Sequence, residues 1–181
     1  MNPRLVHFVA GDSGNWRIRE IRCVIGESLP LASRLMVSSE APSTEGSWVL
    51  KGVTSNERYV TRAEKEKLLA RQEGLGRSDS TCAALIPIKK NAAWWALTQD
   101  ERRDIFEAQS KHNEIGMRYL PAIARRLHHC RDLSSLEPFD FLTWFEYRPE
   151  HEAEFDALLL QLRSSPEWEF VEREVDVRLG L

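Results

Sequence analysis

The chain has 181 residues, of which 42% are hydrophobic, so it can bury one core but is too short for two independent enzyme domains. We therefore predict a single domain over residues 1–181. The formal net charge is −3, and charges of both signs are mixed along the chain. Nucleic-acid binding is not expected, because proteins of that class usually carry a basic excess.

The cysteines and the N-terminal residues indicate the cellular compartment of the protein. Cys23, Cys82 and Cys130 are widely spaced and form neither a CxxC pair nor the CxxCH motif of covalent haem attachment. We expect reduced thiols in a cytoplasmic protein. Residues 1–16 hold only a short apolar run, so no signal peptide is predicted, and no stretch reaches transmembrane length, so no membrane partner is expected.

The first part of the chain is predicted to be mostly strands. Residues 38–46 (SSEAPSTEG) are polar and turn-prone and are predicted to be a loop. A helix is expected over residues 61–72, because Thr61 and Glu64 have the spacing of a capping box. Three runs rich in branched and aromatic residues are predicted strands: residues 5–10, 16–25 and 48–54.

The second part alternates strands and helices. Residues 81–88 are predicted to be a buried strand, and a second capping box, Thr98 with Glu101, begins a helix that ends near Gly116. That helix has an apolar side formed by Ile105, Phe106, Ala108 and His112. The stretch 119–130 is compatible with helix or strand, and we favour strand. The remaining predicted elements are a strand over 139–147, a helix that begins at Pro149 and is closed by residues 164–166, and a final alternating strand over 169–179.

This order predicts the fold class. From residue 81 onward it is strand, helix, strand, strand, helix, strand, which is the split βαβ arrangement called ferredoxin-like. Residues 1–78 could form a shortened version of the unit that residues 79–181 form in full. We therefore predict an α+β fold in which two ferredoxin-like sheets form a barrel-like body with helices outside.

The chemistry-bearing residues are sparse. The sequence contains no phosphate loop, Rossmann glycine pattern, GxSxG or HExxH. Of five histidines only His112 lies on the apolar side of a predicted helix, where a hydrogen-bonded structural histidine is the common alternative to a ligand. His128 and His129 point to opposite faces of a strand and cannot hold one ion together. Arg125 and Arg126 must likewise face opposite ways, and whichever points inward needs an anion.

Several long runs carry a more specific resemblance, which extends from about Trp16 to the C-terminus. They are SNERYVTRAEKEKLLARQ, AALIPIKKNAAWWALTQDERRDIFEAQSKHNEIGMRYLPAIARRLHHCRDL, PFDFLTWFEY and EWEFVEREVDVRL. In these runs the chain resembles the chlorite dismutase family, and in particular its short, dimeric branch.

The resemblance implies a haem b site with assigned residues. His112 corresponds to the proximal ligand of the iron, and Arg125, thirteen residues later, corresponds to the arginine over the open iron face. Glu167 matches the carboxylate beside the far nitrogen of the ligand, which fixes its tautomer and adds electron density. The other implied residues are Gln72, matching a distal glutamine, and Lys90, Trp94, Asn56 and Tyr59, matching residues that hold the propionates or flank the pocket.

The resemblance also implies a reaction. Ferric haem would take an oxygen atom from chlorite, giving ferryl haem and transient hypochlorite, and their recombination would release chloride and dioxygen. A guanidinium stays charged throughout and offers several donors, so an arginine suits the task of holding both anions. A homodimer with a detoxifying role is expected.

Three alternatives remain at this stage. The coproheme decarboxylases share the fold and the histidine but lack the distal arginine, so Arg125 argues against them. A haem-binding protein without turnover is possible; a dye-decolourising peroxidase relative is disfavoured, because its GxxDG-type motif is absent. The third alternative is a dimeric ferredoxin-like interaction module without a cofactor.

Overall fold

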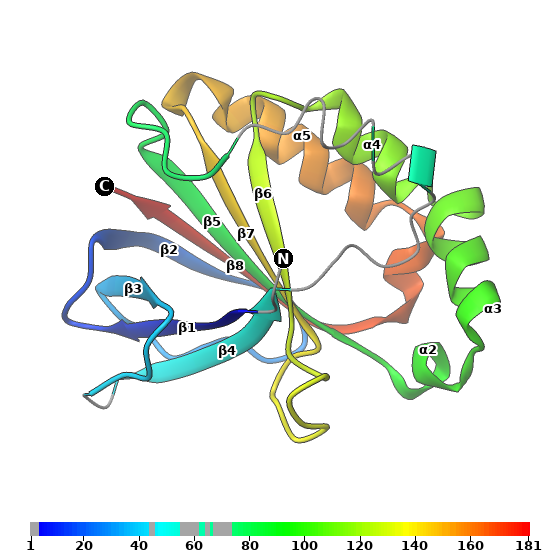
Figure 1. Cartoon of the computed structure of the whole chain (residues 1–181), viewed down its shortest axis with the longest axis horizontal. Helices are drawn as coiled ribbons and strands as arrows, with labels where there is room; N and C mark the ends of the chain where they lie inside the picture. Colours follow the sequence, from blue (N-terminus) through cyan, green and yellow to red (C-terminus); the bar gives the residue numbers. More distant parts are fainter. Residues whose placement is uncertain (1–3, 44–45, 55–61, 64–65, 67–73) are drawn as a thin grey trace.

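Eight antiparallel strands form a closed barrel in the computed structural model, which describes residues 4–43, 46–54, 62–63, 66 and 74–181 (Figure 1). Around the barrel the order is β1-β3-β2-β8-β5-β7-β6-β4, and pairing of β4 with β1 closes it. The strands are β1 (Arg4–Gly11), β2 (Trp16–Ile25), β3 (Arg34–Ser38), β4 (Trp48–Thr54), β5 (Cys82–Lys90), β6 (Ala124–His129), β7 (Phe141–Tyr147) and β8 (Val171–Gly180).

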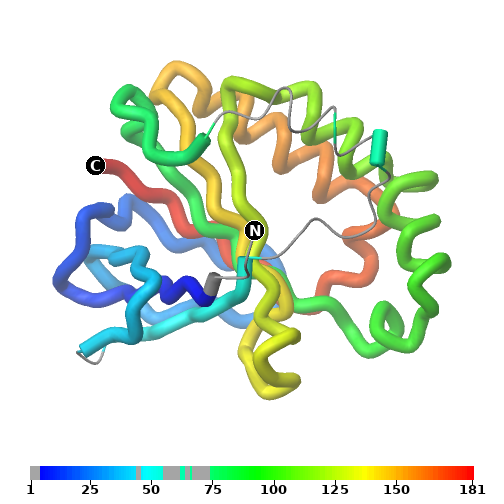
Figure 2. The backbone as a smooth tube through the Cα atoms, viewed as in Figure 1, coloured from blue at the N-terminus to red at the C-terminus, as the bar shows by residue number. Residues whose placement is uncertain are grey.

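The helices gather outside one half of the barrel, over β5 to β8, and no helix of the described residues covers β1 to β4 (Figures 1 and 2). None of the described helices is long and apolar enough to span a bilayer. They are α2 (Ala92–Ala96), α3 (Gln99–Arg103), the π-helix η1 (Asp104–Gln109), α4 (His112–Arg118), the 3-10 helix η2 (Pro149–His151), α5 (Glu152–Arg163) and the 3-10 helix η3 (Pro166–Phe170). The predicted α+β content and barrel-like body with outer helices are confirmed.

Strand alternation divides the apolar side chains between two cores. The inner core fills much of the barrel with residues such as Phe8, Leu85 and Trp144. The outer core lies between the sheet and the helices and includes Phe145 of β7 and Phe155 of α5. A side chain on β5 to β8 therefore faces either the barrel interior or the helices, and its parity along the strand decides which.

The helix-facing side of β8 is charged yet buried. Glu174, Asp176 and Arg178 are at most 4% exposed, whereas the valines between them face the barrel interior. The guanidinium of Arg163 on α5 bonds both carboxylates, and Arg178 bonds Asp176 and Asp156. Buried charges of both signs therefore satisfy one another beneath α5.

Comparison with the predicted elements gives matches and corrections. The strands at 16–25 and 48–54 have the predicted bounds. Strand β3 was missed, since its five residues follow a Pro- and Ser-containing segment and gain their order by pairing with β1 and β2. The final strand begins at Val171 instead of 169, because Glu169 and Phe170 belong to η3. The helix predicted over 61–72 lies outside the described residues apart from 62–63 and 66.

The predicted helix from Thr98 to Gly116 needs the largest correction. Its capping box is present, but the chain passes from α3 into η1 and then turns at Ser110 and Lys111 before α4 begins. Lys111 has a left-handed backbone with φ of 52°. The stretch after Gly116 is also corrected, since β6 begins only at Ala124.

Candidate active site

His112 is the first residue of α4, directly after the left-handed turn at Lys111. Its Nδ1 lies 2.7 Å from Oε2 of Glu167 in η3, so this carboxylate accepts the Nδ1–H hydrogen bond. The backbone N–H of Glu167 in turn donates to the hydroxyl of Ser110 at 2.9 Å. The turn between η1 and α4 thus positions the imidazole next to η3, because Ser110 in this turn binds η3 directly.

Glu167 also pairs with a lysine. The ammonium of Lys90, at the end of β5, lies 2.8 Å from Oε1, and the side chains of Lys90 and Glu167 are 3% and 6% exposed. Burial by itself would raise the pKa of Glu167, but its electrostatic interactions with His112 and Lys90 and the hydrogen bonds that they donate lower it to about 2. Glu167 is therefore a carboxylate throughout the neutral range.

Aromatic rings surround the imidazole. The ring of Phe106 in η1 lies nearly parallel to that of His112, with centroids 4.2 Å apart, and the ring of Trp168 lies 6.5 Å away, also nearly parallel. The indole N–H of Trp168 donates to Glu174 at 2.7 Å, which ties this ring to the buried charges of β8. The side chain of His112 stays 22% exposed, so its ring borders on open space.

Trp94 lies beside the Lys90–Glu167 pair. It belongs to α2, which is capped by Asn91, whose side-chain oxygen accepts the backbone N–H of Trp94. The Lys90 ammonium lies 4.5 Å from the centre of the Trp94 ring. The indole N–H of Trp94 is buried and has no hydrogen-bond partner among the described residues. A buried donor without a protein acceptor suits a ligand that brings its own acceptor.

Arg125 reaches α4 from the sheet. In β6 it pairs with Phe145, whose side chain belongs to the outer core, so Arg125 faces the helices. Its guanidinium packs against Gly116, where even an added Cβ would overlap it. Because Gly116 follows His112 by four residues, Arg125 and the imidazole meet the same side of α4. Arg126 pairs with Trp144 and faces the barrel interior, as the strand prediction requires.

The donor set fits haem better than a metal ion held by protein alone. Among the described residues no three His, Cys, Asp or Glu side chains are grouped to hold a metal. A single imidazole whose Nδ1 is engaged has only Nε2 to offer, so the remaining ligands must come with the metal, as they do in a porphyrin. The unpartnered indole N–H of Trp94 and the flat aromatic surroundings point the same way.

Some of the predicted site residues lie close together in the structure. The structure brings together His112, Glu167, Lys90 and Trp94, and it places Arg125 on the same helix face as His112. Asn56, Tyr59 and Gln72 lie outside the described residues. Sequence reasoning missed Ser110, Gly116 and Glu174, since each acts through a contact distant in sequence; only the glycine inside a helical run offered a signal.

Comparison with known proteins shows the family of the chain. The model of the chlorite dismutase family matches residues 24–181, and the chain belongs to that family. The crystal structure of a dimeric chlorite dismutase from Nitrobacter winogradskyi is 57% identical and superposes with a TM-score of 0.90, covering 97% of this chain and 98% of that one.

More distant relatives are longer. The chlorite dismutase of Ideonella dechloratans is 30% identical over 125 residues, which are 65% of this chain and 39% of that protein. The structure of the Candidatus Nitrospira defluvii chlorite dismutase in complex with imidazole is 25% identical, with a TM-score of 0.59, and covers 81% of this chain and 56% of that one. This chain therefore spans about two-fifths to slightly over half of these longer relatives.

Proposed function

We propose that the site around His112 binds haem b and converts chlorite to chloride and dioxygen. The observation that carries the proposal is the pairing of an imidazole held by Glu167 with a guanidinium on the same side of α4. Bound haem supplies the redox chemistry that breaks the chlorine–oxygen bonds and forms the bond between the two oxygens.

His112 is the proposed iron ligand through Nε2. With Nδ1–H donated to Glu167, the lone pair on Nε2 would be available to a haem iron, and the hydrogen bond restricts rotation of the ring. The low pKa of Glu167 keeps a full negative charge behind the ring, and this charge would stabilise oxidised iron in a bound haem. Lys90 balances that charge and, with its ammonium on Glu167, acts as a positioning residue for the carboxylate.

Trp94 is the proposed donor to a haem propionate, because its buried indole N–H has no acceptor in the described part of the chain. Asn56 and Tyr59 complete the proposed propionate side, and Gln72 the distal side, on the strength of the family resemblance alone. These three assignments remain predictions.

Arg125 is the proposed substrate-binding residue. Chlorite and hypochlorite carry negative charge that the guanidinium attracts, and its donors can hold the oxidant until the second step is complete. Gly116 leaves room for this guanidinium against α4. The oxidant would otherwise escape and attack the aromatic side chains around the site.

The assembly proposed for this chain is a homodimer, since the Nitrobacter winogradskyi protein that resembles it over nearly its whole length is described as dimeric. We also propose that residues 1–181 are one domain made of two ferredoxin-like units, the first shortened. The strand order β8-β5-β7-β6 of the second unit supports this description. The cytoplasmic location and the detoxifying role remain predictions from the sequence.

An oxygen electrode tests the function. Haem-loaded protein given chlorite should evolve oxygen, and His112→Ala, given the same haem, should not. His129→Ala is a suitable control, because that histidine lies on β6 and contacts the ring of Phe141. Haem binding without oxygen release would favour the non-catalytic alternative and contradict the proposal.

A further inference from the structure

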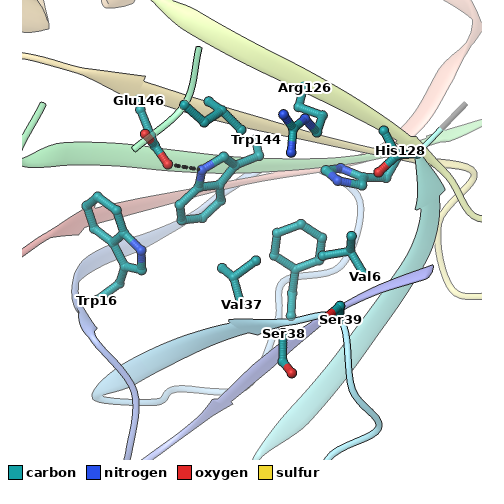
Figure 3. A pocket seen from close by; sticks show the side chains of 12 residues that line it. Val6, Trp16, Val37, Ser38, Ser39, Arg126, His128, Trp144 and Glu146 are labelled. Atoms are coloured by element: carbon teal, nitrogen blue, oxygen red, sulfur yellow. Dashed lines mark hydrogen bonds between the residues drawn. The ribbon is translucent and has the colours of Figure 1, made fainter. Parts of the chain in front are cut away.

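The inside of the barrel is not completely filled. The barrel interior contains a cavity of about 390 Å³, which lies on the face of β6 and β7 opposite the helices. Eight-stranded barrels are either filled by their side chains or hold one small ligand, and this volume is at the lower end of ligand pockets. The lining residues include Val6, Trp16, Val37, Arg126, His128 and Trp144, which Figure 3 shows around one space.

Most of the wall is aromatic and apolar. The indoles of Trp16 and Trp144 meet edge to face at 5.4 Å, and Phe8 lies 5.8 Å from Trp144. Val6 and Val37 continue the apolar surface on the neighbouring strands. Rings arranged in this way offer both faces and edges to a flat apolar ligand.

Arg126 supplies the positive charge of the cavity. It follows Arg125 in β6 and therefore points the other way, into the barrel, where its side chain is open to solvent. No residue of the described chain forms an ion pair with its guanidinium. Glu146 lies on the same wall, but its carboxylate accepts the indole N–H of Trp144 at 2.8 Å and the backbone N–H of Gly76 at 2.5 Å.

His128, which lines the cavity from the same strand as Arg126, adds no second positive charge. Burial lowers its pKa to about 4, and the charge of Arg126 lowers it as well, against the opposing hydrogen bond to the backbone oxygen of Leu142. The imidazole is therefore neutral near pH 7. The cavity then combines an apolar wall with the guanidinium of Arg126 near its opening, the hydroxyls of Ser38, Ser39 and Thr54, and the carboxylate of Glu146, whose oxygens accept the N–H groups of Trp144 and Gly76.

We propose that the barrel interior is a second binding site, separate from the His112 site, and that it takes a small aromatic monocarboxylate. The carboxylate would bind Arg126 with charge-assisted hydrogen bonds, and the ring would lie against Phe8 and Trp144. A simple inorganic anion would leave most of the cavity and its apolar wall uncovered. The site stands independently of the proposed haem function, because none of its lining residues contacts His112 or Glu167.

Calorimetric titration of haem-loaded protein with 1-naphthoate tests the proposal. The parent protein should bind naphthoate, and Arg126→Gln should weaken binding by roughly tenfold or more, as expected for the loss of a charge-assisted contact. The neutral analogue 1-naphthalenemethanol should bind parent and variant within about twofold of each other. Arg125→Gln, on the opposite face of the same strand, should keep the naphthoate affinity of the parent.

A second variant tests the cavity itself. Val37→Phe should fill the space and abolish binding of both compounds, with circular dichroism showing that the barrel is intact. No naphthoate binding by the parent protein, or equal affinity in parent and Arg126→Gln, would overturn the proposal. Loss of binding in Arg125→Gln with retention in Arg126→Gln would place the anion on the helix side of the sheet and would also overturn it.

Discussion

Replacing Glu167 by glutamine should strongly destabilise the protein even without haem. The substitution leaves the ammonium of Lys90 without its counter-ion, and that side chain is only 3% exposed. Removing one partner of a buried ion pair costs about 3 to 5 kcal/mol, and we expect the lower end because glutamine retains one acceptor oxygen. For a chain of 181 residues a loss of about 3 kcal/mol corresponds to a decrease in Tm of roughly 6 to 12 °C.

The assay is urea unfolding of haem-free protein at pH 7, followed by circular dichroism. A matched double variant, Lys90→Met with Glu167→Gln, removes both charges and should be less destabilised than Glu167→Gln alone. The reasoning would be refuted if Glu167→Gln lost less than about 1 kcal/mol of unfolding free energy. It would also be refuted if the loss in the double variant equalled the sum of the losses in Lys90→Met and Glu167→Gln.

The same pair predicts a pH dependence. The pKa of Glu167 is lowered from 4.5 to about 2 in the folded protein, so protonation favours the unfolded chain. Its contribution is complete above pH 4.5 and is lost as the pH falls towards 2. The difference in free energy of unfolding between the parent and Glu167→Gln should therefore shrink over that interval.

Three further predictions concern the site in its haem-loaded form. His112→Ala should bind haem much more weakly and lose the five-coordinate high-spin absorption spectrum; a normal ferric spectrum would remove His112 from the role. Arg125→Ala should lower the oxygen yield by releasing hypochlorite, detected with a chlorination trap, with a decrease of roughly 30- to 150-fold at most in the rate it controls. Arg126→Ala is its control, and a leak there instead would contradict the assigned strand faces. Gly116→Ala should keep or slightly raise the unfolding free energy, since alanine favours helix by about 1 kcal/mol, yet reproduce the leak by displacing Arg125; an oxygen yield equal to that of the parent would show that the guanidinium needs no such space.

The sequence predicted the features that depend on local pattern. The runs of branched and aromatic residues at 16–25 and 48–54 and the capping box at Thr98 are local signals, and the structure has both strands and the capping box. The opposite orientations of Arg125 and Arg126 follow from strand geometry alone, once β6 is a strand.

Features that depend on distant contacts were not predictable in this way. The turn between η1 and α4 has no strong breaker, and it is stabilised by Ser110 accepting the N–H of Glu167, 57 residues away. Strand β3 gains its order from pairing with β1 and β2. The charged side of β8 would ordinarily suggest solvent exposure, but Arg163 covers it from α5.

The pairing of His112 with Glu167 was predicted from the family resemblance, and neither local pattern nor strand geometry could have predicted it. On local grounds His112 was one histidine on an apolar helix side, and nothing near it in sequence pointed to Glu167. The structure joins the two at 2.7 Å, although the role of the pair as an iron site remains a proposal.

Isotope labelling of the product tests the central claim most directly. Haem-loaded protein given chlorite labelled with ¹⁸O in unlabelled water should release dioxygen in which both atoms are ¹⁸O, measured by mass spectrometry, because the oxidant stays bound beside Arg125 between the two steps. Dioxygen that contains an atom from water, or chlorite consumption without dioxygen, would contradict the account.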